Sequence, residues 1–85
     1  MARYSLRFKK SVAKDLRAIP KKDVRRILRR IEALKDDPRP PGSEKLAGRE
    51  YYRIRQGAYR ILYEIHDDVL LVVVIKAQHR SELYR

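Results

Sequence analysis

The segment from residue 51 to residue 65 limits the possible folds of this chain more than any other. It reads YYRIRQGAYRILYEI, two runs rich in aromatic and β-branched residues on either side of a glycine. Runs of this kind around a short glycine-containing loop predict two antiparallel strands joined by a tight turn. We place the two-residue loop at Gln56 and Gly57. In that register, Arg53 lies opposite Arg60.

Three arginines of this hairpin are expected on one face of the sheet. Because side chains alternate along a strand, Arg53, Arg55 and Arg60 project to the same side. Like charges directly opposite each other destabilise a sheet, so a sequence that gathers them is under another constraint. We interpret the three guanidinium groups as an anion-binding site. The alternative is a solvated sheet face on which the arginines have no special role.

Composition points to one small basic domain that spans residues 1–85. Lysine and arginine number 22 against 11 acidic residues, a net charge of +11, which favours binding to polyanions. Nucleic acid is the first partner to consider, before a membrane surface or an acidic protein. The chain has no cysteine, which excludes disulfides, zinc fingers and thiol nucleophiles. No apolar run reaches the roughly 18 residues of a membrane span, so we expect a soluble cytoplasmic protein without a membrane partner.

The rest of the chain predicts helices followed by strands. Residues 4–8 alternate as a short strand, and residues 9–19 carry apolar side chains at helical spacing. Pro20 suits the start of a second amphipathic helix. The continuous aliphatic run at residues 69–75 predicts a central strand that is buried on both faces. The predicted fold class is α+β with the order β-α-α-β-β-β, a helical hairpin packed on one side of a small, mainly antiparallel sheet, and a short C-terminal tail.

The hairpin and the tail together resemble the RelE branch of the RelE/ParE toxin superfamily. The resemblance rests on Tyr-Arg-Ile-Arg before the glycine turn, Tyr-Arg-Ile-Leu-Tyr after it, and His-Arg-Ser-Glu-Leu-Tyr at residues 79–84. It covers essentially the whole chain. It implies the toxin of a toxin–antitoxin system, which inhibits translation by entering the ribosomal A site and cleaving mRNA there. It also implies a RelB-like antitoxin that wraps the toxin, and contact with operator DNA only through the antitoxin complex.

The resemblance also implies which side chains act. It gives catalytic roles to Arg60, Arg80 and Tyr84, and RNA binding to Arg53, Arg55 and, more loosely, Lys45. Arginine stands at positions 53 and 55, where the family often has lysine. His79 stands near a position where some members have another basic residue, which makes it a further catalytic candidate.

The expected reaction is metal-independent attack by the RNA 2′-OH on the adjacent phosphorus. Guanidinium groups match phosphate geometry but stay protonated, so the arginines suit binding and charge stabilisation rather than proton removal. Imidazole exchanges protons near neutral pH, so His79 is one candidate for proton transfer. Tyr84 is another, although we rank stacking on a nucleobase above that role. We expect Glu64, on the arginine side of the hairpin, to pair with an arginine, with general base as a minor alternative.

No metal site or other cofactor is expected. Two isolated histidines and scattered carboxylates do not form a metal-ligand spacing. Two other functions remain open at this point. One is a ParE-like toxin that poisons gyrase without cleaving RNA, and the other is a non-catalytic basic RNA-binding module.

Overall fold

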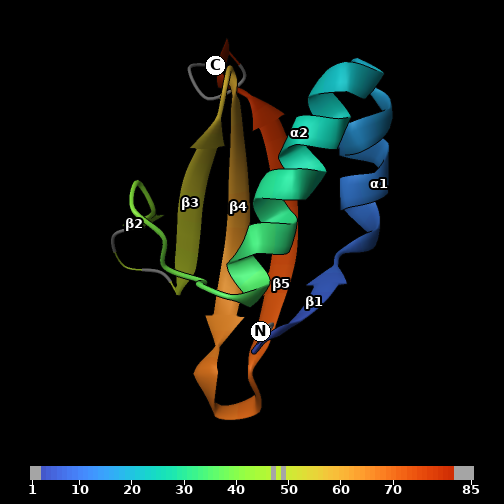
Figure 1. Cartoon of the computed structure of the whole chain (residues 1–85). Coiled ribbons are helices and arrows are strands. Elements are labelled where there is room, and N and C mark those ends of the chain that lie inside the picture. The colour runs from blue at the N-terminus through green and yellow to red at the C-terminus, as the bar shows by residue number, and fades with distance from the viewer. Residues whose placement is uncertain (1–2, 47, 49, 82–85) are drawn as a thin grey trace.

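Two helices cover one face of a five-stranded sheet, and the other face is open (Figure 1). The computed structural model describes residues 3–46, 48 and 50–81. The elements are β1 (Ser5–Phe8), α1 (Lys10–Arg17), α2 (Lys21–Glu32), β2 (Glu44–Lys45), β3 (Tyr51–Gln56), β4 (Tyr59–His66) and β5 (Leu71–His79), with 3-10 helices at Ala33–Lys35 and Asp67–Val69. The predicted α+β class is confirmed, as are the helical hairpin and the start of α2 directly after Pro20.

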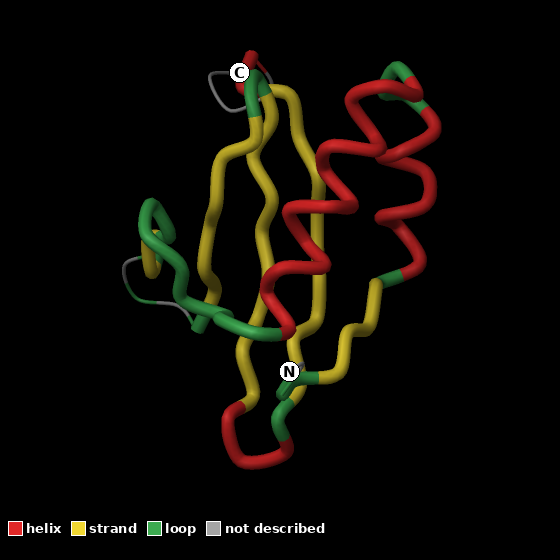
Figure 2. The backbone as a smooth tube through the Cα atoms, in the orientation of Figure 1, coloured by secondary structure: helices red, strands yellow, loops and turns green. Residues whose placement is uncertain are grey.

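The sheet has the strand order β1-β5-β4-β3-β2. β1 runs parallel to β5, and the other neighbours are antiparallel. The edge strand β2 was not predicted, because two residues are too few to show a periodic pattern. In Figure 2, the β3–β4 turn and the end of β5 lie together at one end of the sheet, opposite the β4–β5 connection.

The predicted register of the hairpin is wrong by one position in the loop. The two residues between the strands are Gly57 and Ala58, so Arg55, not Arg53, lies opposite Arg60. The backbone explains the difference. A tight hairpin loop needs a positive φ at its first residue, and Gly57 provides φ +58° without the strain that Gln56 would suffer there. Moving the loop by one residue changes the partner of each β3 residue by two positions, from Ala58 to Arg60 in the case of Arg55. A change of two positions keeps every side chain on the face of the sheet that alternation predicts.

β5 is central, as predicted, but it is not buried on both faces. Val72 and Val74 are fully buried under the helices, whereas Val73 and Ile75 are only partly covered. A β-bulge interrupts the pairing with β4: Leu62 lies opposite Lys76, while Tyr63 lies opposite Val74, which leaves Ile75 as an extra residue. After the bulge, the buried position moves to Ala77. The bulge therefore changes which side of the sheet each later residue faces.

The core lies between the sheet and the helices. Its fully buried members are Val12, Ile27, Ile31, Leu34, Ile54, Ile61, Tyr63, Val72 and Val74. Tyr63 donates a hydrogen bond of 2.7 Å to the carbonyl of Pro38, which ties the loop after α2 to the sheet. Burial raises the pKa of Tyr63 to about 12. Within the described ranges, no helix is both long and apolar enough to cross a membrane.

Candidate nucleic-acid interface

Three arginines from β3 and β4 share the side of the sheet that the helices leave open. We call the surface formed by Arg53, Arg55 and Arg60 the arginine face. Arg53 and Arg55 are two residues apart on β3, and Arg55 lies directly opposite Arg60 on β4, so alternation puts all three on one side. Ile54 and Ile61 point the other way and are fully buried in the core. The hairpin thus holds the guanidinium groups on a rigid support.

Arg60 is the most constrained of the three. It is only 7% exposed, and it is the only charged residue among the buried side chains that the structure describes. No carboxylate of the described residues forms an ion pair with it. A mostly buried arginine directly opposite another arginine destabilises a sheet, and such departures cluster at functional sites. Arg60 is therefore well suited to receive an anionic ligand.

Glu44 on β2 is a member of the site that the sequence did not predict. It lies opposite Arg53 across the sheet edge, and one oxygen accepts a hydrogen bond of 2.7 Å from Arg53 Nη2. That bond, with the positive charges of Arg53, Arg55 and Arg60, lowers the pKa of Glu44. The side chain is therefore an ionised acceptor at neutral pH. The absence of a strand pattern at residues 44 and 45 explains why it was missed.

Two other charged residues near the hairpin, Lys45 and Glu64, each have a charged or titratable neighbour of their own. Lys45 lies opposite Tyr52, which places it on the helix side of the sheet, and its Nζ is 3.7 Å from Glu50. Glu64 is on the same side as the arginines, but it is paired with His66, at 3.0 Å, and not with an arginine. Alternation placed Glu64 correctly but gave no sign of the nearer partner two residues along the same strand.

Of the three candidates from the tail, His79 and Arg80 lie within the described residues. His79 lies opposite Tyr59, and its ring meets the Tyr59 ring edge-on with 5.4 Å between centroids, on the helix side of the sheet. The structure therefore does not bring His79 to the arginine face. The amide of Arg80 donates a 2.7 Å hydrogen bond to Ala58, which holds this part of the tail against the hairpin turn. Tyr84 lies outside the described residues.

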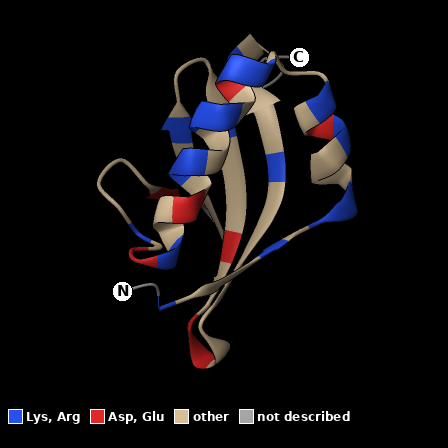
Figure 3. Ribbon diagram, turned by 45° about the vertical axis from the view of Figure 1, so that its right-hand side comes forward, with Lys and Arg blue, Asp and Glu red and all other residues tan. Residues whose placement is uncertain are grey.

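Positive charge is also spread over the helices. Figure 3 shows lysine and arginine at many positions of the two helices as well as in the sheet. These side chains are mostly exposed, as expected for a solvated helix face. They add to the general attraction for polyanions, but they lack the fixed geometry of the sheet. Only at the arginine face do the described residues combine several guanidinium groups, a mostly buried arginine (Arg60) and a carboxylate acceptor (Glu44).

Comparison with known proteins identifies the class. Over residues 6–84 the chain matches the family model of the ParE toxin of the type II toxin-antitoxin system, parDE. It is also 30% identical to Toxin RelG of Mycobacterium tuberculosis, over 96% of this chain and 97% of that protein. The chain is therefore a toxin of a toxin–antitoxin system.

Solved structures place it more narrowly. It matches a chain of the archaeal RelE–RelB complex from Pyrococcus horikoshii OT3 with a TM-score of 0.82 and 30% identity, covering 92% of this chain and 96% of that one. A mutant of E. coli toxin RelE in the free state matches with a TM-score of 0.77 and 26% identity, covering 99% and 92%. The chain belongs to the RelE/ParE toxin superfamily and is a RelE-type toxin within it.

Proposed function

We propose that this toxin is a metal-independent endoribonuclease that cleaves mRNA on the ribosome, with the RNA 2′-OH as nucleophile. The observation that carries the proposal is Arg60, a mostly buried arginine that forms no ion pair with a carboxylate of the described residues and lies directly opposite Arg55. In a nucleic acid, phosphate is the anion whose geometry matches that of a guanidinium group. The likeness to RelE-type toxins supports this reaction class, and the arginine face is where we propose that it takes place.

The reaction forms a bond from the 2′ oxygen to phosphorus and breaks the bond from phosphorus to the 5′ oxygen. It needs phosphate binding, stabilisation of the developing charge, removal of the 2′ proton and protonation of the 5′ oxygen, and the arginine face can supply the first two. Arg53 and Arg55 would hold phosphates of the strand by charge-assisted hydrogen bonds. Arg60, being largely buried and carried on β4, would stabilise the negative charge that develops on the phosphoryl oxygens. Arg80 would act from beside the hairpin turn, where its amide bonds to Ala58, and Tyr84 keeps the catalytic role that the resemblance implies.

The leaving 5′ oxygen can take its proton from solvent water, but the 2′ proton needs a base, and Glu44 is the best-placed acceptor among the described residues. It is ionised, and it already contacts Arg53 at 2.7 Å. A phosphate bound to Arg53 would compete for this guanidinium and remove the interaction that lowers the pKa of Glu44. The carboxylate would then be a stronger base when substrate is bound. His79 is less suited to this step, because it lies on the opposite side of the sheet from Arg60.

We propose further that a cognate RelB-like antitoxin wraps the toxin. Similar structures include a RelE–RelB complex from Pyrococcus horikoshii and the intact E. coli RelBE toxin–antitoxin complex. A net charge of +11 favours an acidic antitoxin segment that neutralises it. Contact with operator DNA would then come through the antitoxin complex.

The nuclease proposal is tested by mapping mRNA 5′ ends in a cell-free translation reaction. Wild-type toxin should create new 5′ ends on translating messages, and Arg60→Ala should abolish them. Arg25→Ala, an exposed position on α2, is the matched control and should cleave like the wild type. Intact messages with wild-type toxin would overturn the proposal. Equal cleavage by Arg60→Ala would overturn the assigned role of the arginine face.

One observation favours a second candidate, since the matching family model is the one described for ParE toxins. A ParE-like toxin would poison gyrase and leave RNA intact. Both activities occur on this fold, so the architecture does not separate them. DNA damage in expressing cells, combined with unbroken mRNA, would favour the gyrase poison.

A further inference from the structure

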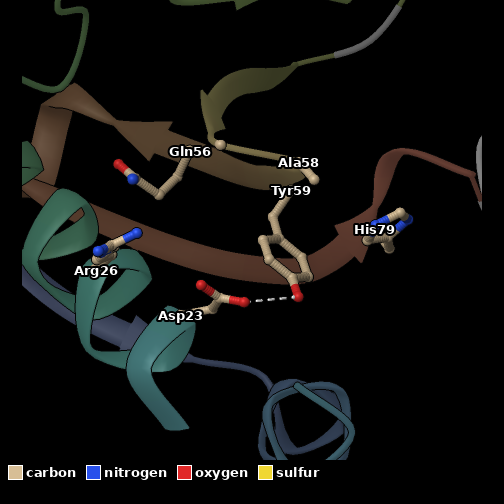
Figure 4. A pocket seen from close by; sticks show the side chains of 7 residues that line it. Asp23, Arg26, Gln56, Ala58, Tyr59 and His79 are labelled. Carbon is tan, nitrogen blue, oxygen red and sulfur yellow. Dashed lines mark hydrogen bonds between the residues drawn. The ribbon is translucent and has the colours of Figure 1, made fainter. Parts of the chain in front are cut away.

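A polar cavity, separate from the arginine face, lies on the helix side of the sheet, at the end where the hairpin turn meets the end of β5. Its volume is about 360 Å³, and its lining residues are Asp23, Arg26, Gln56, Gly57, Ala58, Tyr59 and His79 (Figure 4). Three elements contribute: α2, the β3–β4 hairpin and the last residue of β5. Nothing in the proposed reaction uses this cavity.

One wall of the cavity is aromatic and fixed in place. The hydroxyl of Tyr59 donates a hydrogen bond of 3.2 Å to Asp23 Oδ2. The ring of His79 meets the ring of Tyr59 edge-on, and His79 Nδ1 lies 2.8 Å from Ser81 Oγ. Burial and the bond to Asp23 raise the pKa of Tyr59, so its hydroxyl remains a donor at neutral pH. The wall therefore offers a preformed surface against which a planar group can pack.

The other lining residues offer hydrogen-bonding groups of both kinds. A carboxylate has about four acceptor positions, so Asp23 can bind a ligand while it holds Tyr59. Arg26 is exposed on α2, and its guanidinium supplies donors only. The amide of Gln56 supplies a donor and an acceptor. An aromatic wall beside mixed polar groups is the arrangement in which proteins bind unstacked bases of single-stranded RNA.

We propose that this cavity is a nucleobase subsite for a nucleotide next to the scissile phosphate. The proposal rests on the nuclease function above. The cavity and the arginine face are separated only by the end of the hairpin: Gly57 and Ala58 line the cavity, while Arg55 and Arg60 lie on the other side of the same turn. Gly57 presents no side chain, and no atom lies within 4 Å of where its Cβ would stand. A single strand can thus pass round the turn with phosphate on one side and base on the other.

The chemistry of Asp23 predicts which bases the subsite accepts. A carboxylate only accepts hydrogen bonds, so it favours bases with an exocyclic amino group. Uracil has none, and its single ring donor is flanked by two carbonyl oxygens that would face the carboxylate. We therefore expect selection against uridine at one position beside the cleaved bond.

The test compares wild type with Asp23→Asn on a message library in which the positions around the cleaved bond are randomised. The asparagine amide can still accept the Tyr59 hydroxyl, but it also donates. In Asp23→Asn, the ratio of cleavage with another base at the subsite position to cleavage with uridine there should fall by about 5- to 150-fold, while cleavage at other sequences persists. Arg26→Gln should alter the base profile at that same position, and the neighbouring Arg25→Gln should leave it unchanged. Thermal melting of each variant confirms folding.

A binding measurement separates failure of the subsite from failure of the nuclease. Short homopolymers of adenosine, cytidine and uridine are titrated against wild type and Asp23→Asn at one salt concentration. Wild type should bind the uridine strand most weakly, and the variant should narrow the difference. If wild type cleaves but Asp23→Asn keeps its base profile, the subsite is refuted and the nuclease stands. If wild type cleaves nothing, the nuclease is refuted, and equal binding of all three strands then refutes the subsite as well.

Discussion

Replacing Arg60 with methionine should make the protein more stable and inactive at once. Arg60 is 7% exposed and lies directly opposite Arg55. Methionine fills the volume of the aliphatic stem without carrying the charge. Removing a like-charged cross-strand pair is worth about 0.2–1 kcal/mol, and replacing a mostly buried charged side chain with an apolar one adds to this gain. Attraction to Glu44 offsets part of this gain.

We therefore expect Arg60→Met to raise the free energy of unfolding by about 1 kcal/mol, which corresponds to a rise in Tm of about 4–8 °C for a domain of this size. Urea unfolding monitored by circular dichroism measures the change. The matched control is Arg25→Met on the exposed side of α2, which should change stability by less than about 0.5 kcal/mol.

A second arm of the same experiment uses inorganic phosphate as a ligand. An anion that binds only the folded protein stabilises it by RT ln(1 + [L]/Kd), about 1.4 kcal/mol at ten times Kd. Phosphate should therefore stabilise the wild type and Arg25→Met more than it stabilises Arg60→Met. If Arg60→Met is less stable than wild type, or if phosphate stabilises all three proteins equally, Arg60 is a structural residue and the reasoning about its charge is wrong.

Three further substitutions test other contacts. Tyr63→Phe should lower stability by about 1–2 kcal/mol, because it removes the donor to Pro38. The pKa of Tyr63 in the folded protein is raised to about 12 from 10.0, so the contribution of this residue to stability is full below pH 10 and is lost as the pH rises towards 12. Urea unfolding of the wild type across this pH range measures the loss. The pKa of Asp67 is lowered to about 2, first by its bond to Arg39, so its contribution is present above pH 4 and lost as the pH falls towards 2. Acid unfolding of Asp67→Asn should lack this component. Glu44→Gln should bind single-stranded RNA several-fold more tightly, because it removes a competing carboxylate, yet cleave it more slowly in single-turnover assays.

Periodic segments of the chain were predictable, because their patterns follow directly from burial on one face. The stripe on α2 predicted a helix whose Ile27 and Ile31 are fully buried, and alternation in the hairpin predicted the shared face of the arginines. The exact loop was not predicted correctly, because the choice between Gln56 and Gly57 as its first residue depends on a single backbone angle.

Contacts between distant segments were not predictable in the same way. Glu44 reaches Arg53 only because two residues of a long loop return to the sheet edge. Arg39 reaches Asp67, with nitrogen–oxygen distances of 3.2 and 2.7 Å, from the same loop. Neither loop position belongs to a periodic run, and the pairing depends on how the loop lies over the finished sheet.

The β-bulge at Ile75 determines which site the residues at the end of β5 serve. Val72 and Val74 face the helices, so uninterrupted alternation would carry Gln78 to that side and His79 to the arginine face. The extra residue shifts the pattern by one, so that Gln78 lies opposite Arg60 and His79 lies opposite Tyr59. Bulges of this kind re-aim side chains, often next to active sites. The bulge thus keeps the His79 ring away from Arg60 and places it in the aromatic wall of the polar cavity. This is the arrangement that the proposed nucleobase subsite requires, with phosphate on one side of the hairpin end and base on the other.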